Sequence, residues 1–384
     1  MCLICDCQDA ESRSEHKYPE KKKLPPLPLL DTLNCGGCMK LTELPSLPRL
    51  ELLNCGICTG LTTLPFLPQL KILNCGNCPG LTELPYLPLL EKLDVWECRG
   101  LTTILTLPQL QTLNCGNCTK LKVIHSLPLL KNLNCWNCPL LTHLPPLPQL
   151  QTLNCGYCTK LKVMPIFPQL QTLECTFCIL TSLPTLPQLQ YLNCSSCRAL
   201  TSLPNFPKLS NLVCSYCYYL TDIPRIQTLQ TLNCNFCPRL TSLINFPLLK
   251  DLTCWNCKSL SVISDCPQLH ILWCHYCKML QGIYNLPNLI HLGCSNCRVL
   301  LNIPNPAQLQ TLDCQHCPWV GVPKNLKYHE NIHRLLSLQR WCRRNNQYWR
   351  FKRWVKTEDF ACFFYAPDQL GGRISKQNIC TLFQ

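Results

Sequence analysis

Charged residues are scarce in this chain, and long apolar runs are absent. Asp, Glu, Lys and Arg make up 15% of its 384 residues and hydrophobic residues 47%, so the chain can bury a long core. Prolines and polar residues interrupt every apolar stretch before it reaches 18 residues, and we expect no membrane-spanning helix and no membrane partner. The N-terminus lacks a basic start and an apolar core, so we expect an intracellular protein that no signal peptide directs to secretion.

Acidic residues are also few, and charge is unevenly distributed. The chain has 21 Asp and Glu against 35 Lys and Arg, a formal net charge of +14. Residues 30–317 carry 18 basic and 12 acidic residues, whereas residues 318–384 carry 12 basic and 4 acidic ones. The basic excess is therefore concentrated in the C-terminal tail, where nucleic-acid binding is an alternative that we do not favour.

A repeat of about 20 residues runs from Leu30 to Val320. Its frame is L-x-x-L-x-C-x-x-C-x-x-L-T-x-L-P-x-L-P-x, numbered here as positions 1 to 20. A fixed period of this length predicts a solenoid rather than separate globular domains. One copy buries too little apolar surface to offset its conformational entropy, so the copies must stack. The fifteen copies begin at Leu30, Leu50, Leu70, Leu90, Leu110, Leu130, Leu150, Leu170, Leu189, Leu209, Leu229, Leu249, Leu269, Leu289 and Leu309.

The spacing within one copy predicts a short strand. Positions 1, 4 and 6 are apolar, and side chains alternate along a strand, so we expect position 9 to turn inward where the strand ends. The frame resembles the leucine-rich repeat, L-x-x-L-x-L-x-x-N/C-x-L, with Cys at positions 6 and 9. The resemblance implies a β-rich solenoid over residues 30–320, an arc of about 15 repeats with a parallel sheet on its concave face.

The Leu-Pro pairs at positions 15–16 and 18–19 predict the other side of each turn. Proline fixes its own φ and biases its predecessor toward extended geometry, so L-P-x-L-P favours polyproline-like backbone over a helix. Short repeats with such pairs are similar to the LPX-type repeats of bacterial effectors.

Twenty-nine of the 36 cysteines follow the repeat, fourteen copies having C-x-x-C. Consecutive pairs are mostly 16 residues apart, as in zinc ribbons, but the repeat length alone imposes this spacing. Val95 replaces the first Cys of the fourth copy, which a zinc ligand would not tolerate. Disulfides are a further alternative, since neighbouring strands bring equivalent Cα atoms within range, but a reducing compartment disfavours them. We favour structural thiols that act as small hydrophobes and weak donors to backbone carbonyls, and predict no metal and no cofactor.

Positions 3, 5, 7 and 8 are predicted to point away from the core. Position 5 is Asn in eight copies, which indicates either a hydrogen-bonded ladder or a ligand site. Position 8 is often aromatic in the central and C-terminal copies, and exposed rings are typical of protein-binding surfaces. Alternatively, each ring shields the backbone of its neighbour. The predicted binding residues are Tyr157, Phe177, Tyr216, Phe236, Trp255, Trp273 and Tyr276.

The two ends do not follow the repeat. Residues 1–29 are polar and balanced in charge, which predicts disorder, with a loose metal grouping of Cys2, Cys5, Cys7 and His16 as the alternative. Residues 321–384 are basic and aromatic, and the apolar spacing in 325–344 predicts a helical cap over the last repeat. Residues 354–373 are similar to C-terminal tails of proteins from amoeba-infecting giant DNA viruses. That resemblance would place the protein in the host cytoplasm.

These features predict a non-enzymatic interaction protein that binds a protein partner on its concave face, a host protein if the viral resemblance holds. One alternative is the substrate-recognition part of an effector such as an LPX-type ubiquitin ligase. The tail offers Cys342, Cys362 and Cys380, but none lies in the C-x-D setting of those ligases. A zinc-binding scaffold is the other alternative.

Overall fold

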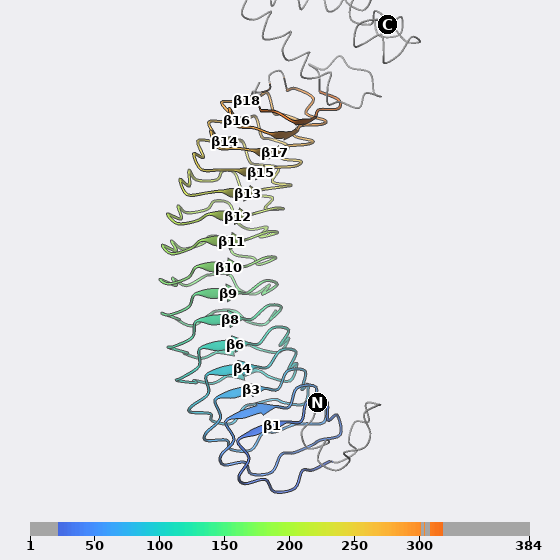
Figure 1. The fold of residues 1–384 in the computed structure, drawn as a ribbon, viewed down its shortest axis with the longest axis vertical. Coiled ribbons are helices and arrows are strands. Elements are labelled where there is room, and N and C mark those ends of the chain that lie inside the picture. Colours follow the sequence, from blue (N-terminus) through green and yellow to red (C-terminus); the bar gives the residue numbers. More distant parts are fainter. Residues whose placement is uncertain (1–21, 301–302, 304–307, 318–384) are drawn as a thin grey trace, which may run out of the picture.

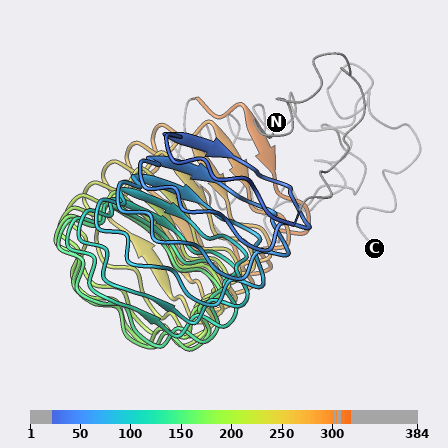
Figure 2. The same ribbon diagram turned by 90° about the horizontal axis from the view of Figure 1, so that it is seen from below.

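The computed structural model describes residues 22–300, 303 and 308–317. They form a parallel β-solenoid that bends gently along its length (Figure 1), and its turns overlie one another with a progressive shift in the end-on view (Figure 2). One sheet has fifteen parallel strands, each contributed by one copy of the repeat. In order along the sheet these are β1 (Thr32–Asn34), β2 (Leu52–Asn54), β3 (Ile72–Asn74), β4 (Lys92–Asp94), β6 (Thr112–Asn114), β8 (Asn132–Asn134), β9 (Thr152–Asn154), β10 (Thr172–Glu174), β11 (Tyr191–Asn193), β12 (Asn211–Val213), β13 (Thr231–Asn233), β15 (Asp251–Thr253), β17 (Ile271–Trp273), β19 (His291–Gly293) and β20 (Thr311–Asp313).

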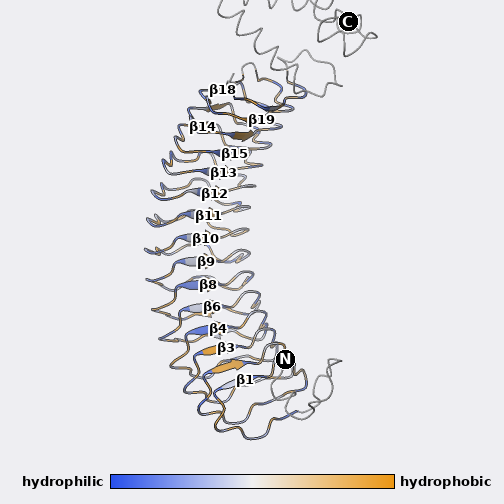
Figure 3. Cartoon of the chain, viewed as in Figure 1, coloured by the Kyte–Doolittle hydropathy of each residue, from blue (hydrophilic) through white to orange (hydrophobic). Residues whose placement is uncertain are grey.

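The register of this sheet equals one repeat, so each strand pairs like positions with like. Leu33 lies opposite Leu53, and every strand covers positions 3 to 5 with the buried Leu of position 4 at its centre. The eighth copy lacks one residue after Cys178, yet Leu173 still lies opposite Leu192. The missing residue therefore shortens a loop without shifting the sheet. Figure 3 shows β2 and β3 as hydrophobic strands, because Leu52 and Ile72 occupy position 3.

The core is a column of Leu and Cys side chains inside the stacked turns. In the second copy, Leu50, Leu53, Cys55, Cys58 and Leu61 are all inaccessible to solvent. Burial of one Leu contributes roughly 1.5–3 kcal/mol, and each turn also covers the flat face of its neighbour. The largest fully buried side chains are Phe167, Phe206 and Phe246, which replace Leu at position 18.

The side opposite the fifteen-stranded sheet depends on proline at position 16. Copies that keep this proline have no strand there, in agreement with the predicted extended backbone. Five described copies lack it, having Leu105, His125, Ile244, Ser264 or Tyr284 instead. Only these copies form further parallel strands: β5 (Thr103–Ile104) pairs with β7 (Val123–Ile124), and β14 (Ser242–Ile244), β16 (Val262–Ser264) and β18 (Gly282–Tyr284) form a three-stranded sheet.

These two small sheets were not predicted from the sequence. Proline has no N–H and cannot donate to a ladder, so its loss restores a donor at this point of the turn. The N–H of His125, for example, donates to the carbonyl of Ile104 in the preceding turn at 2.9 Å.

The predicted helical cap over 321–384 and most of the predicted disordered segment over 1–29 lie outside the described residues. The rest of the fifteenth copy, after Cys317, also lies outside the described residues and stays a prediction. Within the described part of the chain, no helix is long and apolar enough to cross a bilayer.

Candidate functional site

The residue at position 8 has a left-handed backbone in every described turn. Non-glycine φ values there range from 54° at Asn137 to 64° at Asn296, and Gly37 in the first turn has a φ of 82°. This conformation aims the N–H along the stack: the N–H of Tyr157, for example, donates to the carbonyl of Thr176 in the next turn at 2.7 Å. Position 8 therefore continues the hydrogen-bond ladder beyond the strand.

Only some residues suit this backbone. Gly, Asn and Asp adopt left-handed conformations readily, whereas other residues lose roughly 1–2 kcal/mol. Asn77, Asn117 and Asn137 fit this preference. The same conformation carries rings in five turns, which we call the aromatic row: Tyr157, Phe177, Tyr216, Phe236 and Tyr276.

Rings of the aromatic row stack between successive turns. Tyr157 and Phe177 have centroids 4.4 Å apart and planes 18° apart, and Tyr216 and Phe236 are 4.6 Å and 5° apart. Trp136, at position 7, packs against Tyr157 at 69° and 5.5 Å. Despite these contacts Tyr157 remains 37% exposed and Tyr276 52% exposed. The row is thus preorganised and accessible.

The two predicted tryptophans lie in different surroundings. Trp255 is exposed at position 7, and its ring meets His275 of the next turn at 87°. Trp273 is half-buried in β17 and stacks on His275 at 17°. A Cβ added to Gly293, one turn further, would clash with the Trp273 ring. Trp273 therefore lies flat on the sheet and does not extend the aromatic row.

Asparagines at position 5 close the turn and also link neighbouring turns. Asn134 Oδ1 accepts the N–H of Trp136 at 3.1 Å, while Asn134 Nδ2 donates to Asn114 Oδ1 at 3.1 Å. Asn114 Nδ2 in turn donates to Asp94 at 3.1 Å. The ladder expected from the sequence is confirmed over these three turns, and the turn-closing bond explains why an acceptor is placed two residues before position 7.

The two cysteines of each copy have different partners. Each described position-9 thiol from Cys58 to Cys317 lies 3.0–3.3 Å from the position-6 carbonyl of the preceding turn, to which it donates. Cys118 donates in this way to the carbonyl of Val95 at 3.1 Å. Position 6 therefore needs only a buried apolar side chain and its backbone carbonyl, which explains why Val95 is tolerated there. Position 9, in contrast, supplies the donor and keeps its Cys. The thirty cysteines of the described residues are buried and form no disulfide with one another.

Burial and hydrogen bonding shift the pKa values of the buried thiols in opposite directions. Burial raises the pKa of Cys118 well above the ordinary thiol value, raises that of Cys266 to about 11 and that of Cys314 to about 12. A hydrogen bond with the position-6 cysteine of the preceding turn instead lowers the pKa of Cys158, and lowers that of Cys257 to about 4. Nucleophilic and metal-ligating cysteines need the thiolate, but the thiols of Cys158 and Cys257 each donate to a backbone carbonyl. Within residues 22–300, 303 and 308–317, no three His, Cys, Asp or Glu side chains are grouped to hold a metal ion.

The chain shows little sequence similarity to known proteins. No protein-family model matches it, and no curated protein matches its sequence. Among solved structures it is similar to a leucine-rich repeat protein from Bacteroides ovatus, with 16% sequence identity and a TM-score of 0.46 over 80% of this chain and 87% of that one. The fold itself follows from the strand order and register of this chain, which make it a parallel β-solenoid built from leucine-rich turns.

Proposed function

We propose that this protein is a non-catalytic scaffold that binds a protein partner on the face of its fifteen-stranded sheet, with the aromatic row as the main contact. The observation that carries the proposal is the set of five bulky rings, four of them exposed and Phe236 half-buried, at a left-handed position where the backbone favours Gly or Asn. Aromatic side chains supply much of the binding energy at protein interfaces.

The energetic balance supports this assignment. A left-handed ring costs roughly 1–2 kcal/mol relative to Gly or Asn, and ring stacking contributes about 0.5–1.5 kcal/mol. Each stacked pair carries two such penalties and one stacking term, so the rings do not stabilise the solenoid. Ile57 and Glu97 have the same backbone conformation without a stacked ring partner, so stacking is not what this position requires.

The surroundings of the row favour binding over catalysis. The nearby thiols are buried beneath the sheet, and the face presents mainly amide, hydroxyl and aromatic groups. No observation on the described residues favours the ubiquitin-ligase alternative, whose three cysteines lie outside them. A host protein as partner and an intracellular location remain parts of the proposal.

Substitution of the aromatic row by Asn tests the proposal. Tyr157, Phe177, Tyr216, Phe236 and Tyr276 would all be changed to Asn, which suits the left-handed backbone, so the thermal midpoint of the variant should be equal to or higher than that of the wild type. Proteins captured from an amoebal cell extract by the wild-type chain should be lost by this variant.

The matched control is Phe66→Asn with Tyr86→Asn. Both rings are 60% exposed but lie at position 17, outside the aromatic row. The control should capture the same proteins as the wild type. If the variant with all five Asn substitutions folds and still captures the same proteins as the wild type, the proposal is contradicted.

A further inference from the structure

A line of exposed lysines and arginines lies beside the aromatic row. These side chains occupy positions 10, 11 and 13, two to five residues after the row, and we call them the basic flank. Its members are Lys120, Lys122, Lys160, Lys162, Arg198, Arg239, Lys258, Lys278 and Arg298, all of them exposed.

Carboxylates are nearly missing from this strip. At positions 7 to 14 of the copies between Leu110 and Leu300, Asp222 is the single acidic residue against nine cations. The ion pairs within the described part of the chain are Lys23–Glu43, Lys71–Glu51 and Arg99–Glu97, and His275 lies 4.0 Å from Asp313. The basic flank takes part in none of them, so its charge is not neutralised within the described solenoid.

Aromatic contacts order part of the flank. The Arg198 guanidinium lies 5.7 Å from the ring centre of Tyr218 in the next turn. Arg239 lies 4.5 Å from the ring centre of Tyr219 in the preceding turn. A guanidinium stacked on a ring keeps its in-plane N–H donors free, so both cations can still bind carboxylates.

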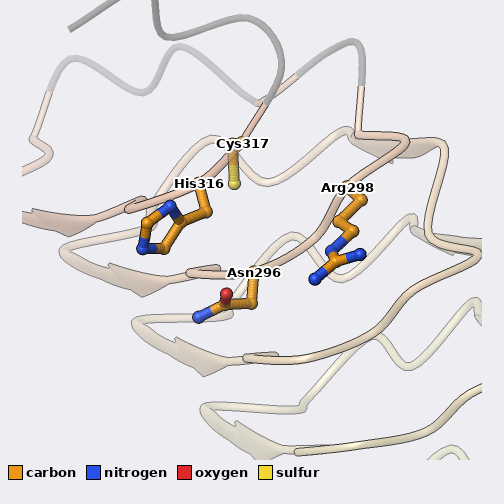
Figure 4. A pocket seen from close by; sticks show the side chains of 4 residues that line it. All are labelled: Asn296, Arg298, His316 and Cys317. Carbon is orange, nitrogen blue, oxygen red and sulfur yellow. The ribbon is translucent and has the colours of Figure 1, made fainter. Parts of the chain in front are cut away.

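The flank and the residues of position 8 border one surface. Near the end of the solenoid, Asn296 and Arg298 of one turn and His316 of the next line the same open hollow (Figure 4). Asn296 and His316 are at position 8, and Arg298 is at position 10. A partner seated on position 8 can therefore reach the cations without leaving this surface.

We infer that the partner of the aromatic row contributes a carboxylate-rich segment that lies along the basic flank, an inference that rests on the proposed function. Neighbouring turns are about 4.8 Å apart, so the flank from Lys120 to Arg298 extends about 43 Å. An extended peptide rises about 3.3 Å per residue, and about 13 residues would follow it. Negative charge along such a segment would meet uncompensated positive charge in seven of the ten turns that it crosses.

The state of the rings favours an acidic polypeptide over nucleic acid. Single-stranded nucleic acid binds by stacking its bases on free aromatic faces. In this row Tyr157 faces Phe177 and Tyr216 faces Phe236, so four of the five rings have one face that is unavailable to a base. Ring edges, which carry the positive end of the quadrupole, remain for contact with carboxylates and apolar groups.

Fluorescence anisotropy with a labelled 13-residue polyglutamate peptide tests the inference on the full chain. The flank variant is Lys160→Gln with Lys258→Gln and Lys278→Gln, which removes three charges without touching the core. Its affinity for the peptide should fall at least about tenfold, since three lost charge contacts amount to about 1.4 kcal/mol or more. The control is Lys131→Gln with Lys208→Gln and Lys250→Gln, at positions 2 and 20, and should bind within about twofold of the wild type.

The outcomes separate this inference from the proposed function. Equal peptide affinity of the flank and control variants would overturn the inference, as would the absence of peptide binding to the wild type. A 13-residue thymidine oligonucleotide that binds more tightly than the peptide would also overturn it, in favour of nucleic acid. None of these results depends on the aromatic-row variant, whose unchanged capture of proteins would contradict the proposed function alone.

Discussion

Two sets of left-handed residues in this solenoid make the same hydrogen bond with different side chains. On the side of the three-stranded sheet, Asn245 donates its N–H to the carbonyl of Ser264, the residue before left-handed Asp265. On the other side, Tyr157 donates to the carbonyl of Thr176, the residue before left-handed Phe177.

The small sheet uses only Asn or Asp at this point, namely Asn245, Asp265 and Asn285. The fifteen-stranded sheet also places Tyr, Phe, Ile and Glu there. Because the backbone demand is the same, the difference cannot come from the turn. The difference indicates that contacts outside the sheet, and not the backbone conformation, determine which side chain occupies position 8.

The largest effect is expected beneath the fifteen-stranded sheet, where thiols join successive turns. Cys158→Val should lower the free energy of unfolding by roughly 1–3 kcal/mol, because it removes the thiol donor to the buried carbonyl of Cys135. Cys155→Val, in the same turn, should cost less than about 1 kcal/mol, since Val95 already occupies the equivalent site. Urea denaturation of both variants measures the difference. Equal losses would mean that the thiol bond contributes nothing.

A smaller effect is expected on the opposite side, where proline decides whether a strand forms. His125→Pro removes the N–H that donates to Ile104 and should cost about 1 kcal/mol. His125→Ala keeps that donor and serves as the control. Faster amide exchange at Val123 and Ile124 in the proline variant alone would locate the damage in β7. No difference between the two variants would show that the small sheet is only a by-product of the larger one.

The smallest effect exchanges side chains between the two left-handed sets. Ile57→Asn should raise the free energy of unfolding by about 0.5–1 kcal/mol, and Asn285→Ile should lower it by a similar amount. Thermal unfolding monitored by circular dichroism would report both shifts. If Ile57→Asn destabilised the chain, position 8 of the fifteen-stranded sheet would not favour Asn. The backbone requirement would then differ between the two sheets, which would contradict the comparison.

The repeat predicted much of the fold because its restraints are local and recur in every turn. Leu at position 4 and Cys at position 6 predicted the strand and core, and Val95 predicted that position 6 acts as a hydrophobe. The left-handed backbone also had a signal, since Gly37, Asn77 and Asn117 share position 8, but the aromatic copies hid it.

Features that join different turns were harder to predict. Loss of proline at Leu105 and His125 creates a strand only because two adjacent copies lose it together. Trp273 lies flat because Gly293, twenty residues later, leaves room for its ring. Both features depend on residues in two different copies, so a motif within a single copy cannot predict them.

Each strand pairs with the next at a shift of one whole repeat, so single repeats could be removed from the solenoid. One whole copy could be deleted, from its first Leu to the residue before the next copy. The two turns brought together would then make the same strand pairing that each made with the deleted turn. Such a deletion would shorten the molecule by about 4.8 Å while leaving the remaining units in place. The length of the fifteen-stranded sheet can therefore be reduced in steps of one strand.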